Sequence, residues 1–171
     1  TNTELDTRVP LLVSSPALPS GGRQASTLAE LLDVYPTLCD LAGLPKPAHL
    51  QGTSLVGALH DPTANVKNVA FSQYPKRSGN QTATGYALRD ERYRLILWIG
   101  TDDPRRPVLD VDLFDHQTDP HEQRSVARDL SSAGFREAAR SILEKADYRV
   151  NGYRREPEIL DKLLTWKGHA K

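Results

Sequence analysis

The stretch Asp112-Leu113-Phe114-Asp115-His116-Gln117-Thr118-Asp119-Pro120-His121-Glu122-Gln123 is the most informative part of the chain. An apolar pair opens it, an Asp-Pro pair closes it, and an acidic segment follows. Because Asp and Pro favour turns, and Pro has no amide hydrogen for a sheet ladder, this pattern is typical of a strand that ends in a turn. We therefore expect a strand over residues 108–114.

Further β-type segments precede this strand and predict a small antiparallel sheet. Asp90-Glu91-Arg92 separates two of them as a hairpin turn, and Pro75 is expected to end another, leaving residues 76–82 as a polar loop. The alternation of Arg92 and Arg94 with apolar residues predicts one wet and one buried face. A helix with apolar residues every three or four positions follows. The predicted strands and helix cover residues 69–74, 85–89, 93–99, 108–114 and 135–143.

The first part of the chain looks incomplete as a folding unit. Val9–Val13 reads as a buried strand, and a helix is expected from an N-cap at Asp33 to a stop at Gly43. One strand and one helix cannot bury a core without a partner sheet. We expect three regions: the last strand and helix of an α/β domain (1–60), an antiparallel sheet with a helix (61–150) and a charged tail or helix (151–171).

Composition narrows the functional classes. The 171 residues carry 22 Lys and Arg against 22 Asp and Glu, and this zero net charge argues against a dedicated nucleic-acid binder. No apolar run approaches the roughly 20 residues that span a bilayer. No signal peptide is visible and Met is absent, so we expect a processed product or a piece of something longer. The single Cys39 cannot form an internal disulfide and is expected to be structural.

Four segments, in this order, resemble the sulfatase family of the alkaline phosphatase superfamily. They are Arg8-Val9-Pro10-Leu11, the helix Asp33–Gly43 followed by Leu50-Gln51-Gly52-Thr53-Ser54-Leu55, the hairpin Ala87–Ile96, and the Asp112–Glu122 stretch. The hexapeptide Phe71-Ser72-Gln73-Tyr74-Pro75-Lys76 is closest in look to iduronate-2-sulfatase, although the loop that follows is shorter here. The resemblance implies the C-terminal part of an α/β, alkaline phosphatase-like fold. Its elements would be the end of a mixed α/β sheet and a four-stranded antiparallel sheet packed by a C-terminal helix.

The resemblance also implies chemistry that this chain does not contain. Sulfatases use a formylglycine made from the first residue of Cys-x-Pro-x-Arg, together with Ca²⁺ held by carboxylates and an amide. After Cys39, Leu41 and Gly43 stand where the motif requires Pro and Arg, so the motif is absent. We expect the catalytic residues, the calcium ligands and a sulfate-binding Lys to lie upstream of Thr1. No catalytic and no metal-binding residue is assigned to this chain.

Substrate contacts are expected from Lys76, Arg77 and Tyr74. Cations suit a uronate carboxylate or a neighbouring sulfate, whereas a solvated loop and, for Tyr74, simple packing are the plainer alternatives. A cluster of acidic and imidazole side chains also suggests a metal, but a solvated strand edge and turn explains it better, since no EF-hand glycine turn is present. Its members are Asp110, Asp112, Asp115, His116, Asp119 and His121.

The leading hypothesis is the C-terminal portion of a sulfatase that removes a 2-O-sulfate from a uronic acid of a sulfated polysaccharide. Its partner would be the N-terminal catalytic portion, and the 171-residue chain alone would be inactive. Two alternatives stay open: a stand-alone, non-catalytic glycan-binding or interaction module, and part of a related phosphoesterase or phosphonate hydrolase. A secreted, periplasmic or lysosome-like location is expected from the resemblance.

Overall fold

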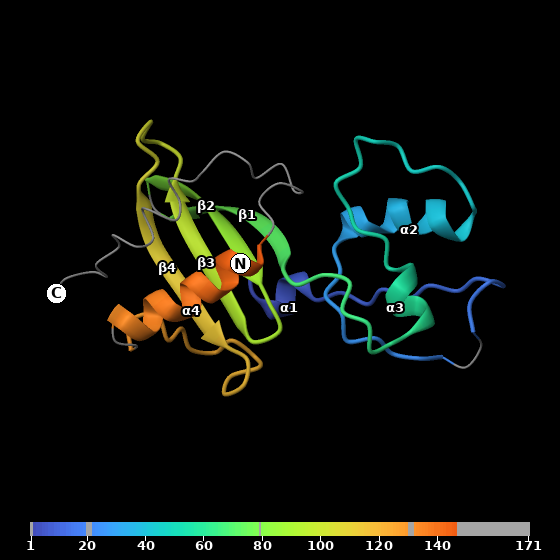
Figure 1. Ribbon diagram of the computed structural model, residues 1–171. Helices are drawn as coiled ribbons and strands as arrows, with labels where there is room; N and C mark the ends of the chain where they lie inside the picture. Colours follow the sequence, from blue (N-terminus) through green and yellow to red (C-terminus); the bar gives the residue numbers. More distant parts are fainter. Residues whose placement is uncertain (1, 20–21, 79, 130–131, 147–171) are drawn as a thin grey trace.

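The computed structural model shows a sheet with one long helix against it (Figure 1). Next to the sheet lies a largely irregular part that holds two short helices, and its described residues are 8–19 and 22–68. The structure describes residues 2–19, 22–78, 80–129 and 132–146. The tail or helix expected over residues 151–171 lies outside these ranges.

The sheet has four antiparallel strands in the order β1-β2-β3-β4, each hydrogen-bonded to its neighbour in sequence. This confirms the antiparallel sheet that the hairpin spacing predicts. The strands are β1 (Ala70–Ser78), β2 (Gln81–Arg89), β3 (Tyr93–Gly100) and β4 (Val108–Asp115).

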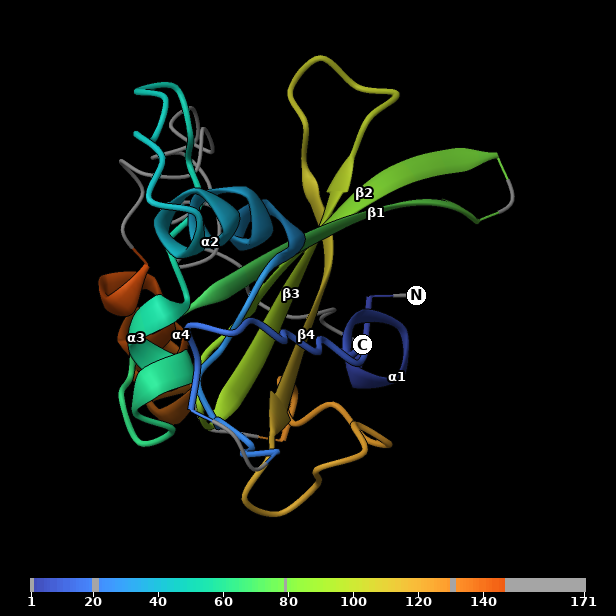
Figure 2. The ribbon, with the colours of Figure 1, turned by 90° about the vertical axis from the view of Figure 1, so that its right-hand side faces the viewer.

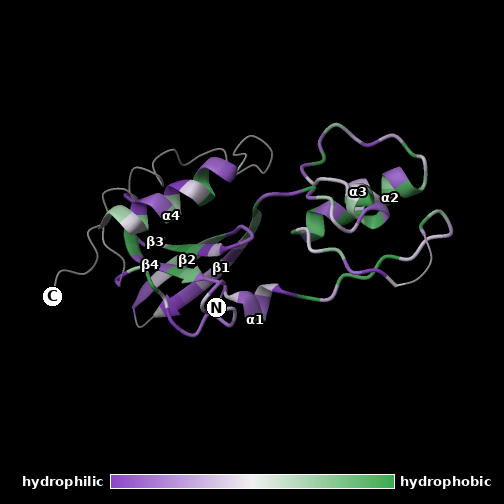
Figure 3. Ribbon diagram, turned by 60° about the horizontal axis from the view of Figure 1, so that its bottom comes forward, coloured by the Kyte–Doolittle hydropathy of each residue, from purple (hydrophilic) through white to green (hydrophobic). Residues whose placement is uncertain are grey.

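Helix α4 (Ser132–Lys145) covers one face of the sheet, and the short helix α1 (Glu4–Thr7) lies on the other (Figure 3). The apolar repeat of α4 meets alternate residues of the strands, as a 3.6-residue period against a 2-residue period requires. The buried core between them includes Leu95, Leu97, Ile99, Val111, Leu113, Phe135, Ala139 and Ile142.

The expectation that Pro75 ends the first strand is wrong. β1 continues through Pro75, which pairs with Thr84, to Ser78. β1 is an edge strand, where a residue without an amide hydrogen is tolerated because that side has no ladder partner. As a result Lys76 and Arg77 lie on a strand rather than in a loop.

The expected wet face of β3 is also wrong. Arg94 is 3% exposed and Ile96 is 1% exposed, so β3 is buried on both faces. A second apolar cluster of Ala87, Ile96, Trp98 and Phe114 lies on the face opposite α4. β3 is a central strand, and α1 with its polar partners covers this second face.

The irregular part contains α2 (Val34–Leu41) and α3 (Val56–His60), preceded by a 3₁₀ turn at Leu31–Asp33 (Figure 2). Gly43 has a φ of 64° and ends α2, as the sequence predicts. Asp33 does not cap the helix with its side chain. Its fully buried carboxylate accepts hydrogen bonds from the Thr53 amide (2.7 Å) and from Lys67 (2.8 Å).

The buried strand expected at Val9–Val13 is not formed. Val9 is 60% exposed and Leu12 is 89% exposed, and residues 8–13 have no regular secondary structure. A strand needs a neighbour for its amides and carbonyls, and none lies beside this segment among the described residues. Other large apolar side chains of the same part are exposed as well, namely Leu11, Leu31, Leu32, Tyr35, Leu38 and Leu44. No helix in the described part of the chain is long and apolar enough to cross a membrane.

Candidate functional site

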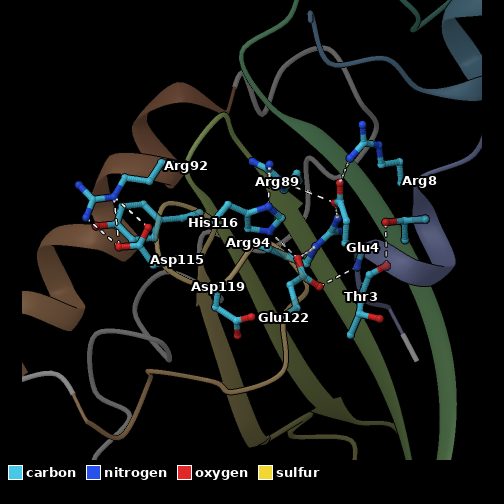
Figure 4. Close-up of polar contacts among 12 residues, drawn as sticks. Thr3, Glu4, Arg8, Arg89, Arg92, Arg94, Asp115, His116, Asp119 and Glu122 are labelled. Atoms are coloured by element: carbon cyan, nitrogen blue, oxygen red, sulfur yellow. Dashed lines mark hydrogen bonds and ion pairs between the residues drawn. The ribbon is translucent and has the colours of Figure 1, made fainter.

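Five ionisable side chains meet on the sheet face opposite α4, and we call them the charge network (Figure 4). Arg89 and Arg94 come from β2 and β3, where they face each other in register. Glu4 is the first residue of α1. His116 and Glu122 come from the turn after β4, that is, from the stretch that opens the sequence analysis.

Arg94 is the centre of this network. Its Nε donates to Glu122 Oε1 (2.5 Å) and its Nη2 donates to Glu4 Oε2 (2.6 Å). The other Glu122 oxygen accepts the backbone amide of Glu4 (2.7 Å), which fixes the start of α1 on the sheet. Glu122 has a φ of 53°, a left-handed conformation that a residue other than glycine adopts only at some cost. The buried contacts with Arg94 and Glu4 offset that cost.

His116 has a defined tautomer in this arrangement. An arginine only donates, so the 2.9 Å contact between Arg89 Nη2 and His116 Nδ1 makes Nδ1 an acceptor. The proton then lies on Nε2, which donates to Glu122 Oε1 at 2.6 Å. His116 therefore links Arg89 to Glu122 through its two ring nitrogens.

Burial and charge act against each other on the two partly exposed members. Burial tends to raise the pKa of Glu4, but the hydrogen bond and charge of Arg94, with help from Arg89, hold that pKa below its usual value. Burial lowers the pKa of Arg89, and the neighbouring charge of Arg94 lowers it further, while Glu4 opposes the change.

The network does not fit a calcium ion. One ligand atom each from Glu4, His116 and Glu122 lies within 4.8 Å of the others, which is the spacing of a metal site. However, the two carboxylates already bind Arg94, and His116 Nδ1 already contacts Arg89. A hard cation needs several free oxygens, and here it would meet two guanidinium groups. The arrangement is an ion-pair network that joins α1 to the sheet.

The remaining acidic residues of Asp112–Gln123 and of strand β4 do not converge on a common metal site. Each accepts a hydrogen bond from the protein, and the partners differ. The pairs are Asp110 with Arg128 (3.0 Å), Asp112 with Trp98 Nε1 (2.9 Å), Asp115 with Arg92 (2.8 Å), and Asp119 with the Arg124 amide (2.9 Å).

Asn2 fixes the chain just before α1 to the same face. Its amide nitrogen donates to the carbonyls of Gly85 (3.1 Å) and Ser72 (3.3 Å), and the Ser72 hydroxyl donates to its oxygen (2.6 Å). The side chain is among the most buried of the polar ones, with Asn2 2% exposed. The segment that leads into α1 therefore lies across β1 and β2.

The three expected substrate contacts lie on both faces of β1. Lys76 lies on the α1 side, where its ammonium is 4.6 Å from the centre of the Trp98 ring, and Tyr74 shares that side because it is two residues away. Alternation places Arg77 on the other side. Its charge helps to lower the pKa of Asp102, after the hydrogen bonds from Thr82. Lys76 and Tyr74 are thus brought together, and Arg77 is not.

Sequence reasoning missed Glu4, Arg89, Arg94 and Trp98 as members of this face. The sequence signalled the hairpin but not this pairing, because a turn over residues 90–92 would place Arg89 opposite Tyr93, one position from the observed partner Arg94. Two like charges side by side on central strands need anions between them. The sequence had no comparable signal for Glu4, which reaches the sheet from 90 residues away.

Comparison with known proteins gives a consistent result. The family model described as "N-sulphoglucosamine sulphohydrolase, C-terminal" matches residues 3–148. Human arylsulfatase K is 33% identical over 131 residues, which cover 72% of this chain and 23% of that protein. A "Delta 4,5-hexuronate-2-O-sulfatase" of Bacteroides thetaiotaomicron is 26% identical over 152 residues, which cover 84% of this chain and 30% of that protein.

Among solved structures, a "2-O GAG sulfatase" superimposes with a TM-score of 0.52 at 24% identity, covering 80% of this chain and 30% of that one. At this identity the likeness concerns the fold. The chain spans less than a third of the length of the curated relatives that it matches, for example 29% of mouse arylsulfatase K.

Proposed function

The chain belongs to the N-sulphoglucosamine sulphohydrolase C-terminal family of the sulfatases, and from this premise we propose that it is the C-terminal portion of a sulfuric ester hydrolase. An N-terminal portion would carry the catalytic residues, and residues 1–60 would complete its α/β sheet. The observation that carries the proposal is the set of exposed apolar side chains in the irregular part, among them Leu12, Leu31, Tyr35 and Leu38.

These exposed apolar side chains have the character of groups that are buried against a partner. Val9, Leu11 and Leu12 are exposed, and among the described residues no strand pairs with this segment, as expected of a strand without its sheet. Exposed apolar side chains on α2 lie in the same part of the molecule, and such groups of exposed apolar residues mark surfaces that bind a partner. A sheet from the catalytic portion would pair with residues 8–13 and cover α2 in one step.

The chemistry would come from the catalytic portion. Formylglycine needs Cys-x-Pro-x-Arg, which this sequence lacks, and Cys39 is buried in α2 with 4% exposure. Calcium finds no suitable free ligand set in the charge network, so we derive no metal-dependent step from these residues. Their contribution would be to hold the start of α1 and the α1 side of the sheet in place.

The proposed substrate is a 2-O-sulfated uronic acid within a polysaccharide, and Lys76, Arg77 and Tyr74 are the proposed contacts. The similarity to a protein named as a hexuronate-2-O-sulfatase and the Phe71–Lys76 hexapeptide support this choice. The exposed Lys76 ammonium would attract the carboxylate. The two alternatives, a stand-alone glycan-binding module and a phosphonate or phosphate ester hydrolase, are tested by the same experiment. We also propose that the complete enzyme works outside the cytoplasm.

The experiment compares the 171-residue chain alone with the same chain joined to its upstream catalytic portion. Both are assayed for sulfate release from a 2-O-sulfated uronate disaccharide, with and without a calcium chelator, and for phosphonate hydrolysis. We expect turnover only from the joined protein. Turnover by the chain alone, or hydrolysis of phosphonate in preference to sulfate, would overturn the proposal. Tight binding of sulfated glycan by the chain alone, with no upstream portion, would favour the module.

A further inference from the structure

Lys76 is held in an unusual way for a lysine at a sheet edge. Its ammonium lies 4.6 Å from the centre of the Trp98 ring, and among the described residues no carboxylate pairs with it. A lysine on an edge strand often serves only to prevent edge-to-edge pairing, and such a lysine extends into solvent. Here the side chain instead folds back over the sheet, so its charge has a defined position.

The position depends on a glycine in the strand between them. Trp98 on β3 is aligned with Gly85 on β2, and Gly85 is aligned with Tyr74 on β1. A Cβ atom at Gly85 would lie 2.7 Å from Cζ3 of the Trp98 ring, closer than such contacts allow. The missing side chain thus lets the indole lie flat on β2 and reach Lys76, two strands away.

Trp98 is itself fixed at its far edge. Its Nε1 donates to Asp112 Oδ2 at 2.9 Å, and the residue is 7% exposed. An anion at the indole N–H increases the electron density on the ring face, and cations bind to that face. Asp112 therefore both orients the ring and strengthens its attraction for Lys76.

We propose that Trp98 is a positioning residue for Lys76, and that Gly85 and Asp112 keep it in place, so that the ammonium and the Tyr74 ring together read the carboxylate-bearing sugar of the substrate. The inference rests on the proposed function. Lys76 offers N–H donors to the carboxylate, while Tyr74, which is exposed and lies two residues away on the same side of β1, offers an apolar surface to the sugar.

The test uses the complete sulfatase that contains this chain, with two substrates that differ at one group. One is a 2-O-sulfated uronate disaccharide, and the other is the same disaccharide with its carboxylate reduced to an alcohol. Lys76→Ala is expected to raise KM for the uronate by about tenfold and to leave KM for the reduced substrate unchanged. Trp98→Leu is expected to raise only the uronate KM, by about two- to fivefold, since a cation–π contact at a partly exposed site is modest.

Non-additivity is the sharper readout. If Trp98 acts through Lys76, then Trp98→Leu adds little to the uronate KM once Lys76 is alanine. Trp98→Phe retains an aromatic face but loses the bond to Asp112, so it should fall between wild type and Trp98→Leu. Arg140→Ala, which removes an exposed cation from α4 on the other side of the sheet, is the control and should change neither KM.

Two further outcomes separate the inference from the function on which it rests. Equal losses of kcat with both substrates, or additive effects of Trp98→Leu and Lys76→Ala, would mean that Trp98 only stabilises the sheet, and would overturn the inference alone. A wild-type protein that hydrolyses neither sulfate ester would overturn the proposed function and the inference with it. Thermal midpoints of every variant show whether the fold is retained.

Discussion

Replacing Arg94 by methionine tests the charge network directly, because it removes the cation and keeps most of the volume. The Arg94 side chain is 4% exposed, and its two partners, Glu122 and Glu4, are 0% and 18% exposed. After the substitution two carboxylates face each other with Arg89 as the nearest remaining cation. Breaking one side of a buried ion pair costs about 3–5 kcal/mol. For a folded region of this size we expect a fall in Tm of roughly 6–20 °C.

The pH dependence gives the prediction its sign. In the wild type, the pKa of Glu4 lies below the ordinary value of a glutamate, 4.5, so Glu4 contributes stability above that pH, and the contribution is lost as the pH falls through the folded pKa. Without Arg94, burial dominates and the folded pKa of Glu4 moves upward. Protonation of Glu4 at low pH then removes the repulsion between the two carboxylates in the variant. The difference in unfolding free energy between wild type and variant should therefore shrink as the pH falls below the ordinary pKa of a glutamate.

Urea denaturation followed by far-UV circular dichroism, at pH 7 and again in mild acid, measures this difference. The matched control is Arg105→Met, which breaks a bidentate pair with Asp103 that lies on the surface, and it should leave the urea midpoint unchanged. A loss under about 1 kcal/mol for Arg94→Met at pH 7, or the same loss at both pH values, would refute the view that a buried guanidinium holds the two carboxylates together.

Three other substitutions or labels test separate parts of the fold. Gly52→Ala would place a Cβ atom 2.0 Å from the Leu32 carbonyl oxygen, so we expect loss of the folded irregular part, visible as new protease cleavage within residues 22–68 while the sheet survives. Asn2→Ala leaves the Gly85 carbonyl without its side-chain donor and should cost about 1–3 kcal/mol in urea, whereas a neutral result would show that water replaces the amide. Cys39, 4% exposed, should react with a thiol reagent only at the rate of unfolding, and fast labelling in buffer would contradict the burial of α2.

The sheet could be predicted because its signals are local. Hairpin spacing around residues 90–92, the β-prone residues 93–99 and the turn at Asp119-Pro120 each depend on a few adjacent residues. The errors at Pro75 and Arg94 have a common cause, because each depends on which segment lies next to the residue in the folded chain. Pro75 is tolerated because β1 is an edge strand, and Arg94 is buried because Glu4 reaches it from the far end of the chain.

The unformed strand at Val9–Val13 is a different kind of error. Its residue types were read correctly as those of a strand, but a strand is a property of a pair, and the described residues offer this segment no neighbour. Likewise the positions of Lys76 and Tyr74 on one face follow from alternation only once the strand is known to continue past Pro75. The contact between Lys76 and Trp98 then depends on the glycine between them, which no short-range pattern indicates.

Buried, hydrogen-bonded charges join the irregular part to the sheet, and this has a physical advantage. Glu30 accepts the Phe71 amide of β1 at 3.0 Å and also binds Lys67, which in turn binds Asp33. Apolar contacts are not directional, so a segment with apolar groups for two partners can pack on the wrong one. Hydrogen-bonded charges have fixed partners. If exposed apolar side chains such as Leu31 and Leu38 are kept for a catalytic portion, the attachment to the sheet has to be polar, and that is the arrangement that these residues form.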